Sequence, residues 1–557
     1  MNILMNIANN AMQNIQLNLN KNIENINKTN QDIKHIQNIN NQTNEVRKSN
    51  QKFSIHPLPI KNNNSESLIK NIYHLHAKEQ FETAEYNKIN RLKNILNKYQ
   101  YIFSEFIPNF YSVLREQITK QTEITTFSLT TILAANVVIE QIKKLNHELS
   151  ELYKTVNYMV YYYVSAINQD LNIISKSNAL IQTYLYTQKT TETDYSNILN
   201  NIIQKRNECI NELNAILGSE TNITENNFII SINNNFELIN NLMRKKFCYI
   251  WNEYDSNQGT IAYIEPLTEK KQSIESLITT GWLGGILHFR RKILDSATNK
   301  IGQLIVNFAC SLNKQNHEGY DINHQPGKNF FSNLFPEVKA SIHNKSKHIL
   351  LSSWSYSNLI QPEKYQLTFL GNNKWKIKKC SDNTNVNYII KDLDAITSSI
   401  SFSGITLKYH KTEMVSDDTY LIQHDSNIID QLTVEATPDT PIALFKNPND
   451  TEDHMLNAQI MYNLHEQPIV NSQETLNESY EKFKNKIQHR TAELQLNTTQ
   501  KISMSNLLIN DQNDKQSKMF NFENISQNID NLHQNYIANT KVLQIASEML
   551  ENTMKVM

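Results

Sequence analysis

The two ends of this chain carry the same kind of apolar stripe, and this pairing constrains the fold more than any other feature. Within residues 1–50, apolar side chains recur at spacings of four and three, separated almost entirely by Asn, Gln and Lys. Near the C-terminus the same spacing forms heptads, interrupted at Asn539 and Thr553. Such spacing is typical of coiled-coil helices. The residues expected to form a polymerisation seam are Leu4, Ala8, Ala11, Ile15, Leu19, Ile529, Leu532, Tyr536, Leu543, Ala546 and Leu550.

A helix of this kind is marginal alone in water. Full burial of seven or eight seam residues at ~1.5–3 kcal/mol each gives roughly 10–24 kcal/mol. Ordering about 33 backbone residues costs ~1–2 kcal/mol each, which cancels that gain. We therefore expect the termini to be helical only when they pack on each other or on neighbouring chains.

Charge and cysteine content argue against several function classes. The 54 Lys+Arg and 55 Asp+Glu give a net charge of -1, so no overall field attracts nucleic acid or an anionic membrane. Four cysteines, Cys209, Cys248, Cys310 and Cys380, lie far apart without a CxxC pair, which argues against zinc knuckles and disulfide frameworks. We interpret them as buried small apolar residues.

Neither the N-terminus nor any internal run indicates a membrane protein. The first residues lack a basic segment followed by a continuous apolar stretch, so we expect no cleaved secretory signal. The least polar run, 124–139, is shorter than the ~20 residues that span a bilayer. We expect no membrane insertion.

Between the ends, the hydrophobic periodicity of the sequence changes twice. Helical periodicity dominates from 66 to 215 and from 282 to 313, short alternating runs dominate from about 350 to 430, and helical periodicity returns at about 453. The sequence predicts a mainly α fold with a β insert: an elongated multi-domain rod, with a coiled-coil-like terminal domain, a central helical bundle and an inserted antiparallel β domain. The predicted segments are 1–50 and 516–557 for the two halves of the terminal domain, 51–340 for the helical rod with a small hairpin near 228–240, 341–440 for the β domain, and 441–515 for the return helices.

The stretch from 281 to 331 carries an ordered series of residues. It contains a glycine pair, Phe-Arg, Leu-Asp, an Asn, Gly-Gln-Leu, then Asn, His, Gly-Tyr-Asp and Phe-Phe. The residues of interest are Gly284, Gly285, Phe289, Arg290, Asp295, Asn299, Gly302, Gln303, Leu304, Asn313, His317, Gly319, Asp321, Phe330 and Phe331. This series closely resembles that of the flagellar hook-associated protein 1 family, the hook-filament junction proteins. Segments 204–213, 365–377 and 536–546 are similar to the same family.

The resemblance implies a structural subunit of the bacterial flagellum that is secreted and has no catalytic activity. It implies export through the flagellar channel unfolded and assembly at the hook tip by the terminal helices. The implied partners are copies of the chain in a ring, the hook protein, a second junction protein and an export chaperone. We place that chaperone on 520–557, because the seam there is apolar and exposed before assembly.

Several residues of the series also have a direct physical interpretation. Gly284 and Gly285 predict a tight turn into a helix, and Gly319 with the residues after it predicts the end of that helix. Arg290 and Asp295 are placed either to pair with neighbouring elements or to lie on a solvated face, and both alternatives remain open. The run Tyr161 to Tyr163 lacks interleaved basic residues, which favours packing in the core or between helices over base stacking.

Catalytic constellations are not evident. His317, Asp321 and His324 straddle a turn and lack a fourth ligand, and phosphate-binding or nucleophile motifs do not occur. We expect no cofactor, no metal site and no enzymatic activity. Three rival interpretations are a cytosolic coiled-coil scaffold, a metallohydrolase using His317 and His324, and a flagellin-like filament subunit.

Overall fold

A computed structural model describes residues 63–514, except for 121–124, 191–195, 224–227, 234–235, 255–257, 266–267, 356–359, 424–425 and 448–454. The predicted seam residues, from Leu4 to Leu19 and from Ile529 to Leu550, lie outside the described residues. The chain divides into two compact units, 1–491 and 492–557, and the contacts given below lie within the first.

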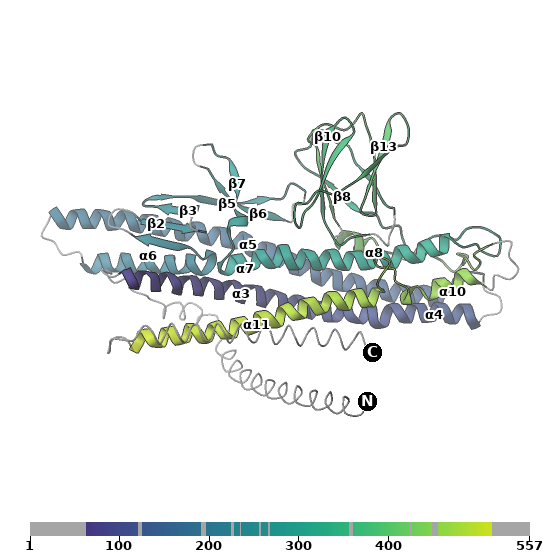
Figure 1. The fold of residues 1–557 in the computed structure, drawn as a ribbon, viewed down its shortest axis with the longest axis horizontal. Coiled ribbons are helices and arrows are strands. Elements are labelled where there is room, and N and C mark those ends of the chain that lie inside the picture. The colour runs from purple at the N-terminus through teal and green to yellow at the C-terminus, as the bar shows by residue number, and fades with distance from the viewer. Residues whose placement is uncertain are drawn as a thin grey trace, which may run out of the picture. The chain divides into compact units, whose positions relative to one another are not determined.

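Long helices form most of the described chain (Figure 1). They are α3 (Asn63–Tyr101), α4 (Ile107–Lys120), α5 (Leu129–Thr190), α6 (Ser196–Leu217), α7 (Gly281–His288), α8 (Asp295–His317), α10 (Leu456–Tyr462) and α11 (Leu476–Asp514), with short π-helical turns η1 (Ile102–Phe106) and η3 (Phe289–Leu294) and the short helix α9 (Ser426–Asp430). In α5 the buried residues recur three and four positions apart, as in Leu145, Leu149, Leu152 and Val156. This repeat places one apolar stripe against the other helices.

Two small sheets lie in the segment between α6 and α7. The first has the strand order β1-β2-β3-β4, and its central pair, β2 (Phe228–Ile232) and β3 (Phe236–Asn240), occupies the stretch predicted to be a hairpin. Its outer strands are β1 (Glu220–Ile223) and β4 (Met243–Arg244). The second sheet consists of β5 (Lys246–Trp251), β6 (Gly259–Ile264) and β7 (Lys271–Ser273), which the sequence interpretation missed.

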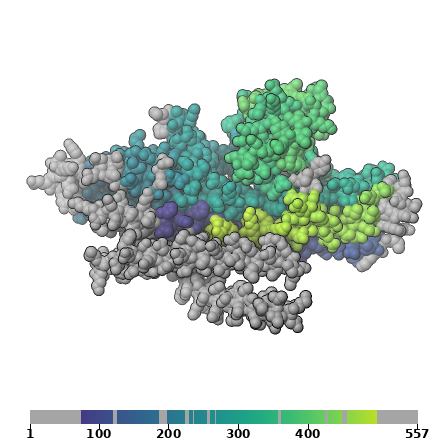
Figure 2. Space-filling model, viewed as in Figure 1, coloured from purple at the N-terminus to yellow at the C-terminus, as the bar shows by residue number. Residues whose placement is uncertain are grey.

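The strands between 337 and 423 form two four-stranded antiparallel sheets that share one core. One sheet has the order β11-β10-β15-β8 and the other β12-β13-β14-β9. Their bounds are β8 (Glu337–Ala340), β9 (Leu351–Trp354), β10 (Tyr365–Gly371), β11 (Lys374–Lys379), β12 (Ile389–Asp392), β13 (Thr397–Phe402), β14 (Ile405–His410) and β15 (Thr419–Gln423). Tyr365 and Trp375 from the first sheet and Ile400 and Leu407 from the second are all buried in this core. These strands form a compact green lobe in Figure 2.

The described residues are therefore helical with antiparallel sheets, as the sequence predicts. β8 lies just before position 341, where the sequence places the start of the β domain, and pairs with β15. The domain boundaries and the terminal coiled coil stay predictions.

Two interpretations of side-chain burial were wrong. Of the run Tyr161 to Tyr163, expected to pack in the core or between helices, the first two are exposed on α5 and the third is half-buried. Of the four cysteines only Cys209 is buried, whereas Cys380 is exposed and the other two are half-buried. The periodicity of a helix shows which residues share a face, but a tyrosine is amphipathic enough to lie on either face.

Candidate functional site

The residue series from 281 to 331 forms the long helix α7-η3-α8 and the loop that follows it. Gly281 has a φ of +71° and begins α7, so this residue makes the turn into the helix. Gly284 and Gly285 lie inside α7, and the prediction that they form the turn was wrong. A Cβ built on Gly285 would lie 2.2 Å from the backbone oxygen of Phe81 in α3. Gly285 therefore permits α3 and α7 to pack backbone against backbone.

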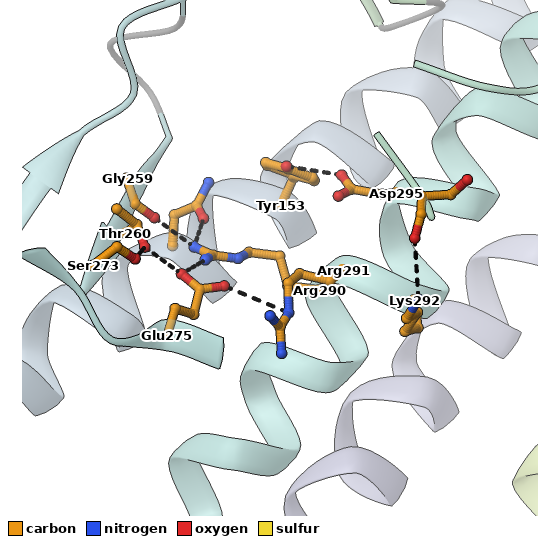
Figure 3. Close-up of polar contacts among 11 residues, drawn as sticks. Tyr153, Gly259, Thr260, Ser273, Glu275, Arg290, Arg291, Lys292 and Asp295 are labelled. Atoms are coloured by element: carbon orange, nitrogen blue, oxygen red, sulfur yellow. Dashed lines mark hydrogen bonds and ion pairs between the residues drawn. The ribbon is translucent and has the colours of Figure 1, made fainter. Parts of the chain in front are cut away.

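Arg290, in η3, is the centre of a buried polar network (Figure 3). Its guanidinium donates to Glu275 Oε2 at 2.7 Å, to Asn157 Oδ1 at 2.9 Å and to the Gly259 oxygen at 3.0 Å. Burial alone disfavours the charged guanidinium, but Glu275, Tyr153 and Tyr249 together outweigh that cost and raise the pKa of Arg290. Thr260 Oγ1 also donates to Glu275 Oε2, at 2.9 Å. The network joins η3, α5, β6 and the short 3-10 helix η2 (Glu275–Leu277).

Asp295 connects the helices to the two four-stranded sheets formed by β8 to β15, called the β sandwich below. Its Oδ1 accepts a hydrogen bond from Tyr153 Oη at 2.9 Å and an ion pair from Lys364 Nζ at 2.9 Å. Tyr153 lies on α5, and Lys364 immediately precedes β10. Of the two alternatives left open for Arg290 and Asp295, the structure supports pairing with neighbouring elements.

The end of α8 holds the loop that leads to the β sandwich. Asn313 Oδ1 accepts from the backbone N–H groups of Phe330 and Phe331 at 2.9 Å each, and its Nδ2 donates to the Phe331 oxygen at 2.8 Å. Both phenylalanines are buried and contact Phe110 of α4. One amide side chain therefore pairs three backbone groups beneath an aromatic cluster.

The loop itself is closed by further residues of the series. His317 Nε2 lies 2.7 Å from Asn329 Oδ1, and Asp321 Oδ1 accepts from the N–H groups of Asn323 and Gln325. A Cβ on Gly319 would lie 2.1 Å from Nδ2 of Asn457, so only glycine fits this position as built.

The remaining residues of the series are buried along the same helix: Phe289, Asn299, Gly302, Gln303 and Leu304. Gln303 Nε2 donates to the backbone oxygen of Ile360. The series as a whole is directed mainly into the protein, where it joins helices, loop and β sandwich.

A second buried ionic cluster escaped the sequence interpretation. The Glu85 carboxylate of α3 is fully buried and accepts from Arg490 Nε at 3.1 Å and Nη2 at 3.0 Å. His288 Nδ1 lies 3.3 Å from the same carboxylate. Burial alone would raise the pKa of Glu85, but the bonds from His288 and Arg490 lower it overall. These residues are distant in sequence, so no local pattern could have joined them.

Among the residues that the structure describes, no group of three or more His, Cys, Asp or Glu side chains is placed to hold a metal ion. In the same part of the chain, no helix combines the length and apolarity needed to cross a membrane.

Comparison with known proteins agrees with the family resemblance. The helical domain of the flagellar hook-associated protein FlgK matches residues 89–331. Flagellar hook-associated protein 1 of Buchnera aphidicola from Schizaphis graminum is 28% identical over 473 residues, 85% of this chain and 84% of that protein. The Salmonella typhimurium protein of the same name is 25% identical over 480 residues, 84% of each chain.

A solved structure shows the same fold. The flagellar hook junction protein FlgK from Burkholderia pseudomallei aligns with 81% of this chain and 100% of that chain, with a TM-score of 0.66 and 14% identity. The matched helical domain and the relatives aligned over most of their length lead to one conclusion: this chain is similar to the flagellar hook-associated protein 1 family along most of its length.

Proposed function

We propose that this chain is the structural subunit that joins hook to filament in a bacterial flagellum. The observation that carries the proposal is its alignment, over 85% of its length, with a protein named flagellar hook-associated protein 1. The chain is secreted, assembles in a ring on the hook tip, and contacts the hook protein on one side and a second junction protein on the other.

The terminal stripes support export and assembly. A helix that is marginal alone threads a narrow export channel unfolded and becomes ordered when it meets its neighbours. Contacts made in this way are heterologous, so that each chain meets the next with a different surface. An export chaperone covers residues 520–557 until then, and a truncation lacking them that still bound the chaperone would exclude this role.

The buried networks support a mechanical role for the centre of the chain. Arg290 and Asp295 each join elements that are far apart in sequence, and Asn313 ties α8 to the loop that follows it. A subunit between hook and filament must keep its shape under load, and such ties fix the helices, loop and β sandwich to one another. The terminal seams hold the neighbouring copies together.

The test is immunogold electron microscopy of flagella and hooks from cells that make this chain, with an antibody against 337–423. Gold at the distal end of the hook is the expected result. Gold along the filament would instead favour a flagellin-like subunit, and labelling confined to the cell interior would favour a cytosolic scaffold. A variant truncated after residue 515 is the matched control, because it keeps the antibody target and should not reach the hook tip.

Hydrogen exchange on the purified monomer tests the coupling of folding to assembly. Amides at 1–50 and 520–557 should exchange fast, whereas those of α8 should be protected. Uniform protection would show that the ends are already packed in the monomer and would contradict the proposed mechanism.

A further inference from the structure

Four large aromatic side chains gather on one exposed surface of the helical part of the chain. Tyr158, Tyr161 and Tyr162 of α5 are 69%, 51% and 60% exposed, and Trp251 of β5 is 56% exposed. We call these four residues the tyrosine face. Nothing in the family resemblance or in the buried networks uses it.

The tyrosine face is a continuous and well-supported surface. Tyr158, Tyr161 and Tyr162 stand three and four positions apart, so they share one side of α5. The ring of Tyr161 lies 5.7 Å from that of Tyr249, whose ring lies 4.9 Å from Trp251. The side chain of Asn168 bonds both the N–H and the oxygen of Phe247 at 2.9 Å, which fixes β5 beside α5.

The charge pattern along α5 changes at this surface. Further toward the N-terminus, solvent-exposed positions of the helix are occupied by charged residues such as Glu140, Lys144 and Lys154. From 155 to 169 the helix carries no Asp, Glu, Lys or Arg. Loss of charge together with enrichment in tyrosine and tryptophan is the composition of the centre of a protein interface.

The size of the surface indicates what kind of partner it fits. Aromatic side chains bury ~150–250 Å² each, so four that are a little over half exposed offer roughly 350–600 Å². A stable complex between free proteins usually buries about 800 Å² on each partner. The tyrosine face is therefore large enough to be the centre of a contact, but too small to hold a partner that arrives alone. It fits an occupant that other contacts already keep near, since tethering raises the effective concentration.

We propose that the tyrosine face is a lateral contact with a second copy of this chain, formed when the terminal helices hold neighbouring copies side by side. This inference rests on the proposed function, because the polymer supplies the tether. In solution the surface stays open and the chain stays monomeric. In the assembled ring it meets a different surface of the neighbouring copy, as a heterologous contact requires.

Site-directed photocrosslinking tests the contact. Full-length chain with a benzophenone amino acid in place of Tyr158 is produced in cells, and hooks are isolated from them. Before irradiation, immunogold labelling checks that the chain is present at the distal end of these hooks. The expected product is a covalent dimer at twice 64.8 kDa, with a peptide of a second copy attached at position 158. A matched control carries the same amino acid in place of Ile389, which is equally exposed on the edge strand β12, and should stay monomeric.

A second variant checks that the aromatic side chains cause the contact. The chain with the benzophenone in place of Trp251 serves as the reference for this test. Adding the double substitution Tyr158→Ser and Tyr162→Ser to it should reduce the dimer product at least tenfold. Because both tyrosines are exposed, its thermal unfolding midpoint should match that of the parent chain.

The outcomes separate the two proposals. If the chain labels the hook tip but position 158 crosslinks to another protein, to its own chain or to nothing, the lateral contact is overturned and the proposed function stands. If the chain is missing from the appendage, the proposed function fails and the lateral contact falls with it. A dimer product that survives the double substitution also overturns the assignment of these residues.

Discussion

Arg290 donates to Glu275 at 2.7 Å, and the two side chains are only 8% and 9% exposed. The same guanidinium holds Asn157 of α5 and the backbone of Gly259. A charge buried so fully is tolerated because the guanidinium donates three hydrogen bonds, one of them to an oppositely charged carboxylate. The pair therefore couples the helices to the small sheet β5-β6-β7.

We expect Arg290→Met to destabilise the chain by about 3–5 kcal/mol, because it leaves the Glu275 carboxylate buried without its main partner. Urea unfolding followed by circular dichroism measures the change. The double variant Arg290→Met with Glu275→Leu should lose less than the sum of the two single variants, since no buried charge remains. Lys154→Ala is the control, because it breaks an exposed ion pair with Glu151 and should leave the midpoint of urea unfolding unchanged. If it lowered the free energy of unfolding as much as Arg290→Met does, burial of the ion pair would not be the cause.

Gly285→Ala tests the close approach of α3 and α7. The new methyl group would lie 2.2 Å from the Phe81 oxygen, a backbone atom that cannot move alone. We expect a net loss of about 1–3 kcal/mol from overpacking, measured by urea unfolding. Gly284→Ala is the comparison variant: its nearest atom, a backbone carbon of Thr279, is at 3.1 Å, a tight contact but longer than the 2.2 Å contact at Gly285, and alanine favours a helix by ~1 kcal/mol, so the loss should be smaller. Equal effects of both substitutions would contradict the assigned roles.

The sequence predicted the helices and the β insert well because their periodicity is long. α5 repeats its apolar stripe over many turns, and the hairpin of β10 and β11 alternates clearly around Asn372 and Asn373. Short strands such as β5 to β7 repeat too few times to give a signal. The glycine pair was assigned to a turn because glycine serves both turns and close helix packing, and only the position of α3 decides between them.

The candidate site was harder to predict than the fold. The resemblance identified Arg290 and Asp295, but their partners Asn157 and Lys364 lie more than sixty residues away. In a chain so rich in asparagine, one more Asn on a helix gives no signal of its own. Which polar residue meets which is decided by the packing of α5, η3 and the β sandwich.

Asn313→Ala should be strongly destabilising, although it removes only an amide. Three buried backbone groups of Phe330 and Phe331 lose their partner, at about 1–3 kcal/mol for each group left unpaired. Thermal unfolding gives the loss, and limited proteolysis should show faster cleavage between 318 and 329. His317→Ala is the comparison variant from the end of α8: its bond to Asn329 closes the same loop but is exposed, so cleavage should increase less than in Asn313→Ala. Equal cleavage in both variants would show that the amide does not hold the loop.

Asp170, buried on α5 against α6, makes the stability of the chain depend on pH. Burial raises its pKa to about 7, the charge of Glu212 adds to the rise, and a bond from the Cys209 thiol opposes it. Because this folded-state pKa lies above that of an unfolded aspartate, about 3.9, the folded chain binds the proton more tightly. The stability that the group contributes is present below about pH 4 and is lost as the pH rises through 7.

Asp170→Asn removes this dependence, because the amide has no charge to bury. At pH 8 we expect the variant to be more stable than the parent chain by roughly 1–3 kcal/mol, and at pH 4 the two should be equal. Urea unfolding at a series of pH values between 4 and 8 gives the difference. Glu212→Gln on the facing helix should produce a smaller change in the same direction, since that carboxylate acts only through its charge. The opposite outcome is a difference in the free energy of unfolding between Asp170→Asn and the parent chain that is the same at every pH. It would show that the carboxyl of Asp170 is ionised in the folded chain throughout, so that burial does not govern its titration.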